Sequence, residues 1–528
     1  MDLGSQEPYD VIVRGGRIVD GTGNPWFHGD VAIRGDRIAA VGDLGDARAG
    51  KVIDAAGLVV APGFIDVHSH AADGLATPGL SHARPLLAQG ITTVVANPDG
   101  GGPSDLAAQA LALERDGLGV NVARLVPLST LRRQVMGMEN RPPTPDETAR
   151  MEALVRQGME AGAFGLSSGL FSAPGTFATT EEIVTLARAA APFGGVYASH
   201  IRDESDYTVG VVAAVDEVIR VARESGLRGI VTHIKGLGPR VWGFSHALIQ
   251  RIERAREQGV EVFADQYPYT ASATGLIDAL VPRWAEEGGR DSLVARLSDP
   301  GLLPRIRQEM AVNLDRRGGA ERIQFRRFPP DPSIEGRTLS DVASARGLDP
   351  IDAALHLARE GAPAIVSFNM LERDVLALMQ RPWVMTCSDG DLVPMGEGVP
   401  HPRTYGAFSH KIRRYVVETG ALPLEAAVRS MTHLPATVLR MDGRGVIRAG
   451  AYADLLVFDP ARVRDAGTYS DPHRLSEGMV HVWVNGRRAV SEGAFTEERG
   501  GAVLRPARWI GGAEPPDAPG ARQGEPGP

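Results

Sequence analysis

Pro62-Gly-Phe-Ile-Asp-Val-His68-Ser-His70 ends in two histidines one residue apart, after a Pro-Gly turn and a run of apolar residues that Asp66 interrupts. On a β-strand, residues i and i+2 point to the same face. His68 and His70 would therefore present both imidazoles to one side, as two metal ligands at the end of a strand do. Taken alone, the pair is equally compatible with a chance arrangement on the surface.

The chain after this stretch alternates between segments typical of strands and segments typical of helices. The helical segments include residues 146–161, 180–190, 207–224, 245–258 and 405–419. Eight such units over roughly 370 residues predict an α/β fold, a (β/α)8 TIM barrel. A doubly wound sheet is the alternative, but no glycine-rich dinucleotide-binding motif follows a strand. The eight predicted strands are residues 63–70, 92–99, 122–129, 163–169, 195–200, 229–235, 259–267 and 383–389.

Short β-branched strands closed by Gly, Asp or Asn occur near both ends of the chain, a pattern typical of hairpins. They predict one small β-sandwich domain built from residues 1–61 and 443–510, with the barrel, residues 62–442, inserted between its two parts. This arrangement also brings the chain ends together, as is common in domains. Residues 511–528 are rich in Pro and Gly without periodicity and are predicted to be a disordered tail.

An insertion of more than a hundred residues, about 282–382, separates the predicted seventh and eighth barrel strands. It includes a charged, helix-prone run at 291–314 and the basic pair Arg326-Arg327. A segment of this length is consistent with a small lid over the mouth of the barrel. A surface excursion without a role in function is the alternative.

The overall composition is that of an ordinary globular protein and limits the functions to be considered. The chain has 528 residues and a formal net charge of −9, so binding to nucleic acid is not expected. Its single cysteine, Cys387, excludes an intramolecular disulfide and a cysteine-rich zinc site. No segment is long and apolar enough to span a membrane, and the N-terminus lacks the pattern of a signal peptide. We therefore expect a cytoplasmic protein without a membrane partner, whose oligomeric state the sequence does not predict.

Polar side chains stand at the predicted ends of several barrel strands, which is where the reactive groups of such barrels lie. Four histidines and two or three carboxylates would converge on one rim, and this convergence favours a metal centre. Imidazole and carboxylate ligands suit zinc or a related divalent metal better than magnesium or calcium. Because the candidates outnumber the ligands of one tetrahedral ion, one or two ions per subunit are expected. The candidate ligands are His68, His70, Asp99, His200, His233 and Asp389.

A metal-bound water loses a proton near neutral pH and becomes a hydroxide nucleophile. A neighbouring carboxylate, which we assign to Asp389, can accept that proton and hand it to a leaving amine, acting as general base and then as general acid. The sequence offers no Ser-His-Asp arrangement or activated cysteine as a competing nucleophile. Cys387 would share a strand face with Asp389, but a small buried hydrophobic residue is the favoured interpretation there.

A series of longer motifs runs in order through the chain: PGFIDVHSH, QGITTVV, GAFGLSSGLFSAPGTFATTEEI, YASHIRDE, VTHIKGLG, DQYPYTA, SDG, HPRTYGAFSH, ADLLVFDP and VNGRR. With these motifs the chain resembles the amidohydrolase superfamily and, within it, the N-acyl-D-amino-acid deacylases, or D-aminoacylases. The resemblance covers about residues 9–505 and implies a barrel with a β-sandwich domain. It also implies a Zn2+-dependent deacylation of N-acyl-D-amino acids to a carboxylate and a free D-amino acid.

The resemblance implies a division of labour among the candidate ligands. His200 and His233 would help to hold a tightly bound zinc ion. His68, His70 and Asp389 would belong to a second, weaker or activating site, with Asp389 as the catalytic base.

The resemblance implies a substrate-binding role for four further residues. Lys235 and Arg403 match residues that hold the carboxylate of the substrate, and a guanidinium with a nearby ammonium suits that role chemically. Solvated surface cations are the alternative for both. One of Tyr267 and Tyr269 is expected to line the pocket or the region that binds the oxyanion.

The chain departs from the pattern of these deacylases at the end of its second strand. Similar deacylases carry a zinc-ligating cysteine there, in a Gly-Asn-Cys-Gly turn, whereas this chain has Ala96-Asn-Pro-Asp99-Gly. An ungapped match places the cysteine position on Asp99. Other superfamily members bridge two metals with a carboxylated lysine on strand four, but that strand, Gly165-Leu-Ser-Ser-Gly, has none. Asp99 is therefore the best remaining bridge, and its harder oxygen should hold a soft metal less tightly.

The leading hypothesis is a metal-dependent amide hydrolase that acts on a small-molecule N-acyl amino acid. Opening of a cyclic amide such as a hydantoin, cleavage of an unusual dipeptide and action on N-acyl-L-amino acids are alternatives within the same superfamily. A catalytically degenerate metal-binding scaffold is a further alternative, which the complete set of histidines with Asp389 argues against. Side-chain preference and acyl length depend on the shape of the pocket and are not predicted.

Overall fold

Parallel strands form a barrel in this computed structural model, which describes residues 8–507 of the chain. The predicted tail, residues 511–528, lies outside the described residues. Each of the eight predicted strand segments overlaps an observed strand, and the segment at 122–129 overlaps two, β8 and β9, which only Leu125 separates. The barrel strands are β6 (Phe64–Asp66), β7 (Ile91–Ala96), β8 (Asn121–Arg124), β9 (Val126–Pro127), β10 (Gly165–Gly169), β11 (Val196–His200), β12 (Arg228–Val231), β13 (Val262–Gln266) and β17 (Val384–Thr386).

The barrel strands lie in two sheets that meet at both edges. One sheet has the order β6-β7-β8 and the other the order β17-β13-β12-β11-β10-β9. At one junction β8 continues into β9. At the other, between β17 and β6, the Asp389 backbone N–H donates to the His68 carbonyl and the His70 N–H donates to the Gly390 carbonyl, each at 2.9 Å. This closure is incompatible with an open, doubly wound sheet. It also means that candidate site residues themselves close the barrel.

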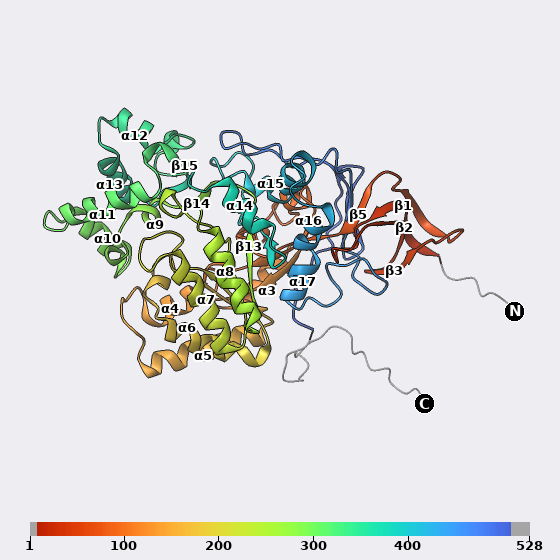
Figure 1. Cartoon of the computed structure of the whole chain (residues 1–528), viewed down its shortest axis with the longest axis horizontal. Coiled ribbons are helices and arrows are strands. Elements are labelled where there is room, and N and C mark those ends of the chain that lie inside the picture. Colours follow the sequence, from red (N-terminus) through yellow and green to blue (C-terminus); the bar gives the residue numbers. More distant parts are fainter. Residues whose placement is uncertain (1–7, 508–528) are drawn as a thin grey trace.

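Helices follow most of the strands and cover the outside of the barrel (Figure 1). The helix α5 begins with a capping box, in which the Thr144 side chain and the Glu147 side chain each accept a bond from the other residue's backbone N–H. Within residues 8–507, no helix combines the length and the apolar composition needed to cross a bilayer. The helices of the barrel region are α1 (Ala72–Leu75), α2 (Arg84–Leu87), α3 (Leu106–Glu114), α4 (Leu128–Met136), α5 (Pro145–Glu160), α6 (Thr180–Ala190), α7 (Val211–Ser225), α8 (Ser245–Glu257), α14 (Glu372–Met379), α15 (Arg403–His410), α16 (Leu424–Met431) and α17 (His433–Val438).

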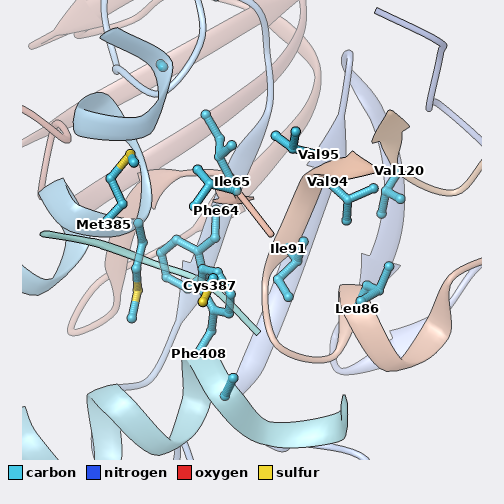
Figure 2. Close-up of a cluster of buried hydrophobic side chains, with 14 of the residues drawn as sticks. Phe64, Ile65, Leu86, Ile91, Val94, Val95, Val120, Met385, Cys387 and Phe408 are labelled. Carbon is cyan, nitrogen blue, oxygen red and sulfur yellow. The ribbon is translucent and has the colours of Figure 1, made fainter. Parts of the chain in front are cut away.

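An apolar cluster joins the first barrel strands to α15 and is shown in Figure 2. The ring of Phe64 on β6 stacks on that of Phe408 on α15, with centroids 5.7 Å apart and an angle of 22° between the rings. Cys387 is fully buried in the same cluster. Its place among apolar side chains agrees with a small hydrophobic role rather than a catalytic one.

Both ends of the chain contribute to one nine-stranded sheet with the order β21-β20-β19-β18-β5-β1-β2-β3, in which β4 also pairs with β1. The antiparallel pair of β5 and β18 joins the two ends. Side chains of β18 alternate between two cores: Leu455 and Val457 pack in the core of the sheet, whereas Leu456 and Phe458 pack with the barrel cluster. The strands are β1 (Tyr9–Ile18), β2 (Phe27–Arg34), β3 (Arg37–Gly42), β4 (Ala49–Asp54), β5 (Val59–Pro62), β18 (Leu455–Phe458), β19 (Met479–Val484), β20 (Arg487–Ser491) and β21 (Ala494–Phe495).

The insertion between β13 and β17 forms a unit with its own apolar core, and Figure 1 shows its helices at the opposite end of the molecule from β1 to β3. The unit starts earlier than the predicted residue 282, because β14 already pairs with β16. It also ends earlier than residue 382, because α14 lies against the barrel helix α8. Its elements are β14 (Ser272–Gly275), α9 (Leu276–Leu280), α10 (Arg290–Ser298), α11 (Leu303–Arg316), β15 (Ile323–Arg327), α12 (Leu339–Arg346), α13 (Pro350–Glu360) and β16 (Ala364–Ser367).

The basic pair of the insertion ties it to the loop that follows β17. Arg326 Nη1 forms an ion pair with Asp391 Oδ2 at 2.8 Å, and Arg327 forms one with Glu397. The Val399 backbone N–H also donates to the Arg326 carbonyl at 2.7 Å. These contacts hold the insertion over the C-terminal end of the barrel, next to His70.

The stacked rings allow a test of this packing. Phe408→Ala should destabilise the protein by about 3–5 kcal/mol, because it leaves a cavity against Phe64. Thermal unfolding followed by circular dichroism should show a clearly lower midpoint. Leu111→Ala is the control, since this side chain is 73% exposed and its loss should leave the midpoint nearly unchanged. Equal midpoints for the two variants would contradict the assigned packing.

Candidate metal centre and substrate cavity

A cavity of about 270 Å3 opens at the C-terminal end of the barrel strands. Most of the predicted site residues line it, and His68 is fully buried beside His70. The insertion contributes to its wall through Ser272, Thr274, Arg317 and Arg326. The predicted residues that line it are His70, Asp99, His200, His233, Lys235, Tyr267, Asp389 and Arg403.

The first group of candidate ligands consists of His68, His70, Asp99 and Asp389. The Nε2 atoms of His68 and His70 each lie 3.3 Å from Asp99 Oδ2. The same nitrogens lie 3.6 and 3.2 Å from Asp389 Oδ1. Four ligand atoms within 4.8 Å of one another can converge on a single cation.

The second group consists of Asp99, His200 and His233. Asp99 faces this group with its other oxygen: Oδ1 lies 3.7 Å from His200 Nδ1 and 3.5 Å from His233 Nε2. One carboxylate thus presents one oxygen to each group. This is the arrangement that a bridging ligand between two cations requires, and it is the role the sequence suggests for Asp99.

The site fits a metal ion, because several of its buried polar atoms lack a hydrogen-bond partner. Both ring nitrogens of His68, the Oδ1 atom of Asp99 and the Nε2 atom of His200 are buried without a hydrogen-bond partner among the described residues. Buried polar atoms normally have partners, so these atoms call for a ligand. The donors are imidazole nitrogens and carboxylate oxygens, which suits zinc and related first-row metals.

The backbone at three of these residues is held in the left-handed region. The φ angles are 55° at Asp99, 35° at His233 and 49° at Asp389. Such conformations cost energy for residues with a side chain and cluster at functional sites. Gly169 on β10 lets the strained turn approach, since a Cβ atom there would lie 2.2 Å from the Asp99 carbonyl oxygen.

Strand β10 also supports the Asp99 turn through Ser167. The Ser167 hydroxyl donates to the Asn97 carbonyl at 2.6 Å and accepts the Gly100 N–H at 3.1 Å. The fourth barrel strand therefore orients the Asp99 carboxylate instead of supplying a ligand of its own.

Two buried aspartates, which our sequence analysis did not select, hold the ligand-bearing strand ends. The Asp66 carboxylate accepts the Ser388 N–H at 2.8 Å and the Ser388 hydroxyl, next to Asp389. The Asp265 carboxylate accepts the His233 N–H at 2.7 Å. Burial raises the pKa of Asp66 to about 6, although the bonds from Ser388 oppose this shift. An aspartate within an apolar strand is the sequence signal that could have identified Asp66.

Glu204 is the other residue that the sequence analysis missed, although it lies in the quoted motif YASHIRDE. Its Oε1 atom lies 3.2 Å from His233 Nδ1, on the side of the ring that faces away from Asp99, and 3.7 Å from His200 Nε2. Carboxylates in this position orient metal-binding histidines. Lys235 Nζ donates to the same oxygen at 2.5 Å and to the His233 carbonyl at 2.9 Å. Burial opposes ionisation of Glu204, but Lys235 and the two histidines hold its pKa well below the ordinary value.

The carboxylates of the site raise the pKa of its histidines. Burial alone would lower the pKa of His70, but bonds with Asp389 and Asp99 raise it to about 10. Burial likewise opposes the charge of His233, yet bonds with Asp99 and Glu204 raise its pKa to about 9. The protons on His70 and His233 balance the negative charge of the buried carboxylates, and a bound metal ion would replace these protons.

The two acids at the centre are carboxylates at neutral pH. Burial would raise the pKa of Asp389, but Arg403, His70 and other histidines hold it far below the ordinary value. Burial acts in the same direction on Asp99, and the surrounding histidines again lower its pKa well below normal. Both side chains are therefore negatively charged and able to accept a proton or bind a cation.

Arg403 is the buried first residue of α15, and its backbone is hydrogen-bonded to a neutral histidine. Its Nη1 atom forms an ion pair with Asp389 Oδ2 at 2.8 Å. The Arg403 backbone N–H donates to His401 Nδ1 at 3.0 Å, so His401 Nε2 carries the proton and donates to the Ala271 carbonyl at 3.0 Å. Burial holds the pKa of His401 well below its usual value.

The two candidate tyrosines have different surroundings. Tyr267 lines the cavity, and the guanidinium of Arg403 lies 4.6 Å from its ring centroid. Tyr269 points elsewhere: its ring stacks on His410 at 4.4 Å, and its hydroxyl donates to Asp465 at 3.4 Å. Tyr267 is therefore the tyrosine of the pair that the structure brings to the site.

This chain is similar to known proteins over most of its length. The model of the Amidohydrolase family matches residues 51–490. The N-acyl-D-glutamate deacylase of Alcaligenes xylosoxydans xylosoxydans is 38% identical over 96% of this chain and 99% of its own length.

Solved structures show the same similarity. The N-acyl-D-glutamate deacylase of Bordetella bronchiseptica, complexed with zinc and a phosphonate inhibitor that mimics the tetrahedral intermediate of the reaction, has a TM-score of 0.82. It is 36% identical and covers 94% of this chain and 100% of that one. A D-aminoacylase structure that addresses a binuclear metal centre, with one-metal activation and second-metal attenuation, has a TM-score of 0.80 at 33% identity. It also covers 94% of this chain and 100% of that one.

The shared carboxylate predicts distinct metal contents for single variants. After saturation with zinc and removal of the excess, the unmodified protein should hold two ions per chain, measured by plasma mass spectrometry. His70→Ala and His200→Ala should each lose one ion, because each histidine belongs to one ligand group. Asp99→Ala should lose tight binding at both positions, whereas His82→Ala, which removes a buried histidine elsewhere, should keep two. An Asp99→Ala protein that retains two ions would exclude the bridging geometry.

Proposed function

This chain belongs to the amidohydrolase family, and we propose that it is a metal-dependent deacylase that hydrolyses N-acyl-D-amino acids to a carboxylate and a free D-amino acid. One observation carries the proposal: two ligand groups that share Asp99 lie in the same cavity as Lys235 and Arg403. The metal-ligand groups suit the hydrolysis of an amide. The positively charged side chains of Lys235 and Arg403 suit a substrate with a free carboxylate.

The chain supplies ligands for one or two divalent ions, with zinc as the proposed metal. His200, His233 and Asp99 would hold one ion, and His68, His70, Asp99 and Asp389 would hold a second. When bound, such an ion polarises the acyl carbonyl and lowers the pKa of a water molecule. Glu204 and Asp265 support the reaction indirectly, because they fix the ring and the backbone of His233.

Asp389 is proposed to move the proton during hydrolysis. Its carboxylate is ionised at neutral pH, so it can accept a proton from the attacking water. As the carbon–nitrogen bond breaks, the same proton passes to the nitrogen, which leaves as the amine of the D-amino acid. Two contacts hold Asp389 in the orientation that this transfer needs: the ion pair with Arg403, and the bond from the Asp389 backbone N–H to the His68 carbonyl.

Lys235, Arg403 and Tyr267 are proposed to position the substrate. The Nη1 atom of Arg403 makes an ion pair with Asp389 but no hydrogen bond within residues 8–507, so its protons remain available to a substrate carboxylate. Among the described residues, the Tyr267 hydroxyl donates only to the sulfur of Met370 at 3.5 Å, a weak acceptor. It is therefore free to donate to a substrate oxygen instead.

We also propose the domain division that the sequence predicts. Residues 1–61 and 443–510 are proposed as one β-sandwich domain; for the described part, residues 8–61 and 443–507, the joint nine-stranded sheet and its separate core support this. Residues 62–442 would form the hydrolase barrel, with the insertion as a lid. The lining of the cavity by Thr274 and Arg326 supports that role over a surface excursion.

Loss of metal and loss of the base should have separate effects. Chelation should abolish hydrolysis of N-acetyl-D-amino acids, and zinc or cobalt should restore it. Asp389→Asn, loaded with metal, should lower kcat by about 10²–10⁴-fold, the range typical of a lost general base. Full activity of the metal-free protein would refute the proposed function, and full activity of the Asn variant would refute the role of Asp389.

The role of Arg403 can be separated from general damage to the site by changing the substrate. The unmodified enzyme should strongly prefer an N-acetyl-D-amino acid over its α-carboxamide. In Arg403→Met this preference should fall by roughly 10–100-fold, the value of a charged hydrogen bond. Arg413→Met, an exposed arginine that pairs with Glu418, should keep it. An unchanged preference in Arg403→Met would assign the carboxylate to another residue.

A further inference from the structure

Arg317 is a fully buried arginine that lines the substrate cavity, and the proposed mechanism does not use it. It caps the C-terminal end of α11 in the insertion and is 1% exposed. Its Nε atom donates to the Tyr207 hydroxyl at 2.9 Å, and its Nη1 atom donates to the Ser367 hydroxyl at 3.0 Å. Both partners are neutral, so they orient the guanidinium without compensating its charge.

Every other arginine or lysine that lines the cavity has an acid beside it. Lys235 pairs with Glu204 at 2.5 Å, whereas Arg403 and Arg326 pair with Asp389 and Asp391, each at 2.8 Å. Within the part of the chain that the structure describes, no carboxylate lies within 4.0 Å of the Arg317 nitrogens. Arg317 is therefore the cation of the cavity whose charge remains uncompensated.

The surroundings of Arg317 increase this positive charge. The guanidinium groups of Arg283, Arg316 and Arg317 lie 5.9, 5.1 and 5.9 Å from the ring centroid of Tyr207. Arg316 is neutralised by Asp206 at 2.9 Å, and Arg283 lies 3.7 Å from Glu286. The three arginines around Tyr207 thus have two acids as partners, and Arg317, which has neither, lines the cavity.

An arginine cannot relieve this burial by losing its proton at ordinary pH. A buried charge without a counterion is costly, so the expected partner is a ligand that brings a negative charge. The Nε proton is donated to Tyr207, and one of the two Nη1 protons is donated to Ser367. The Nη2 atom and one Nη1 proton remain, and they can bind both oxygens of a carboxylate.

We propose that Arg317 binds a carboxylate in the side chain of the substrate, so that the enzyme is selective for N-acyl derivatives of acidic D-amino acids. The inference rests on the proposed function. In the proposed mode of binding, Lys235 and Arg403 hold the α-carboxylate of the substrate, and its acyl carbon lies at the metal ligands. The side chain of the substrate then extends toward the insertion. The barrel then supplies the chemistry, and Arg317 of the insertion supplies the choice of side chain.

The test compares substrates that differ only in charge. The zinc-loaded full chain is assayed on N-acetyl-D-glutamate, N-acetyl-D-glutamine and N-acetyl-D-methionine. The unmodified enzyme should prefer the glutamate derivative over the glutamine derivative by about 100-fold or more in kcat/KM, since the neutral analogue leaves Arg317 unpaired. In Arg317→Met this ratio should approach one, through loss of activity on the acidic substrate alone.

Two further variants distinguish recognition from folding. Arg317→Lys keeps the charge and should retain part of the preference. Arg316→Met, at the same helix end but paired with Asp206, should leave the ratio unchanged. Because the ratio is measured within one preparation, a smaller fraction of folded enzyme does not alter it. If Arg317→Met does not fold, the ratios of the unmodified enzyme and of Arg317→Lys decide.

The outcomes separate this inference from the proposed function. If none of the N-acetyl-D-amino acids is hydrolysed, the proposed function fails. If the methionine or glutamine derivative is hydrolysed as well as the glutamate derivative, the deacylase assignment stands and the role of Arg317 is overturned. An unchanged ratio in Arg317→Met overturns it as well.

Discussion

Asp99 is the group on which the geometry of the site depends, because its two oxygens face different pairs of histidines. A buried carboxylate among imidazoles is stable only when positive charge is supplied, whether by protons or by cations. The residue also holds a left-handed backbone, with φ at 55°, which costs roughly 1–2 kcal/mol for a residue with a side chain. Ser167 and the bare backbone of Gly169 keep this turn in place. Strain and charge are thus concentrated at one residue, which is expected where a fold serves binding rather than stability.

Division of labour between the barrel and the insertion is the second feature of the site. The candidate metal ligands lie at strand ends or in the turns directly after them, where the barrel fixes their positions. Residues that shape the far wall of the cavity, such as Thr274 and Arg317, belong to a unit with its own apolar core. Changes in that unit can alter which substrates fit without moving the ligands. This separation is typical of barrels, in which loops vary on a constant scaffold.

Much of this arrangement could be predicted from the sequence, and the exceptions have physical reasons. The spacing of His68 and His70 predicted that both would face one side, and both rings face Asp99, although β6 already ends at Asp66. The repeated strand–helix pattern predicted which strand ends would meet. The position of Asp66 in an apolar run marks it as unusual, but its role was not predicted, because its partner Ser388 lies 322 residues away and no spacing identifies that neighbour. Glu204 lies in an irregular loop, whose path no periodicity predicts. Tyr269 failed to follow Tyr267 into the cavity because β13 already ends at Gln266, so strand alternation no longer applies there.

The pairing of β5 with β18 has a consequence for how the protein is made. β5 leads directly into the first barrel strand, whereas its partner β18 begins at Leu455. At the usual elongation rates of a ribosome, the apolar edge of β5 waits roughly 20–80 s for this partner. An unpaired apolar strand edge is a template for pairing with other chains during that interval. The synthesis of β18, after the whole barrel, therefore ends the period in which this strand edge is open to aggregation.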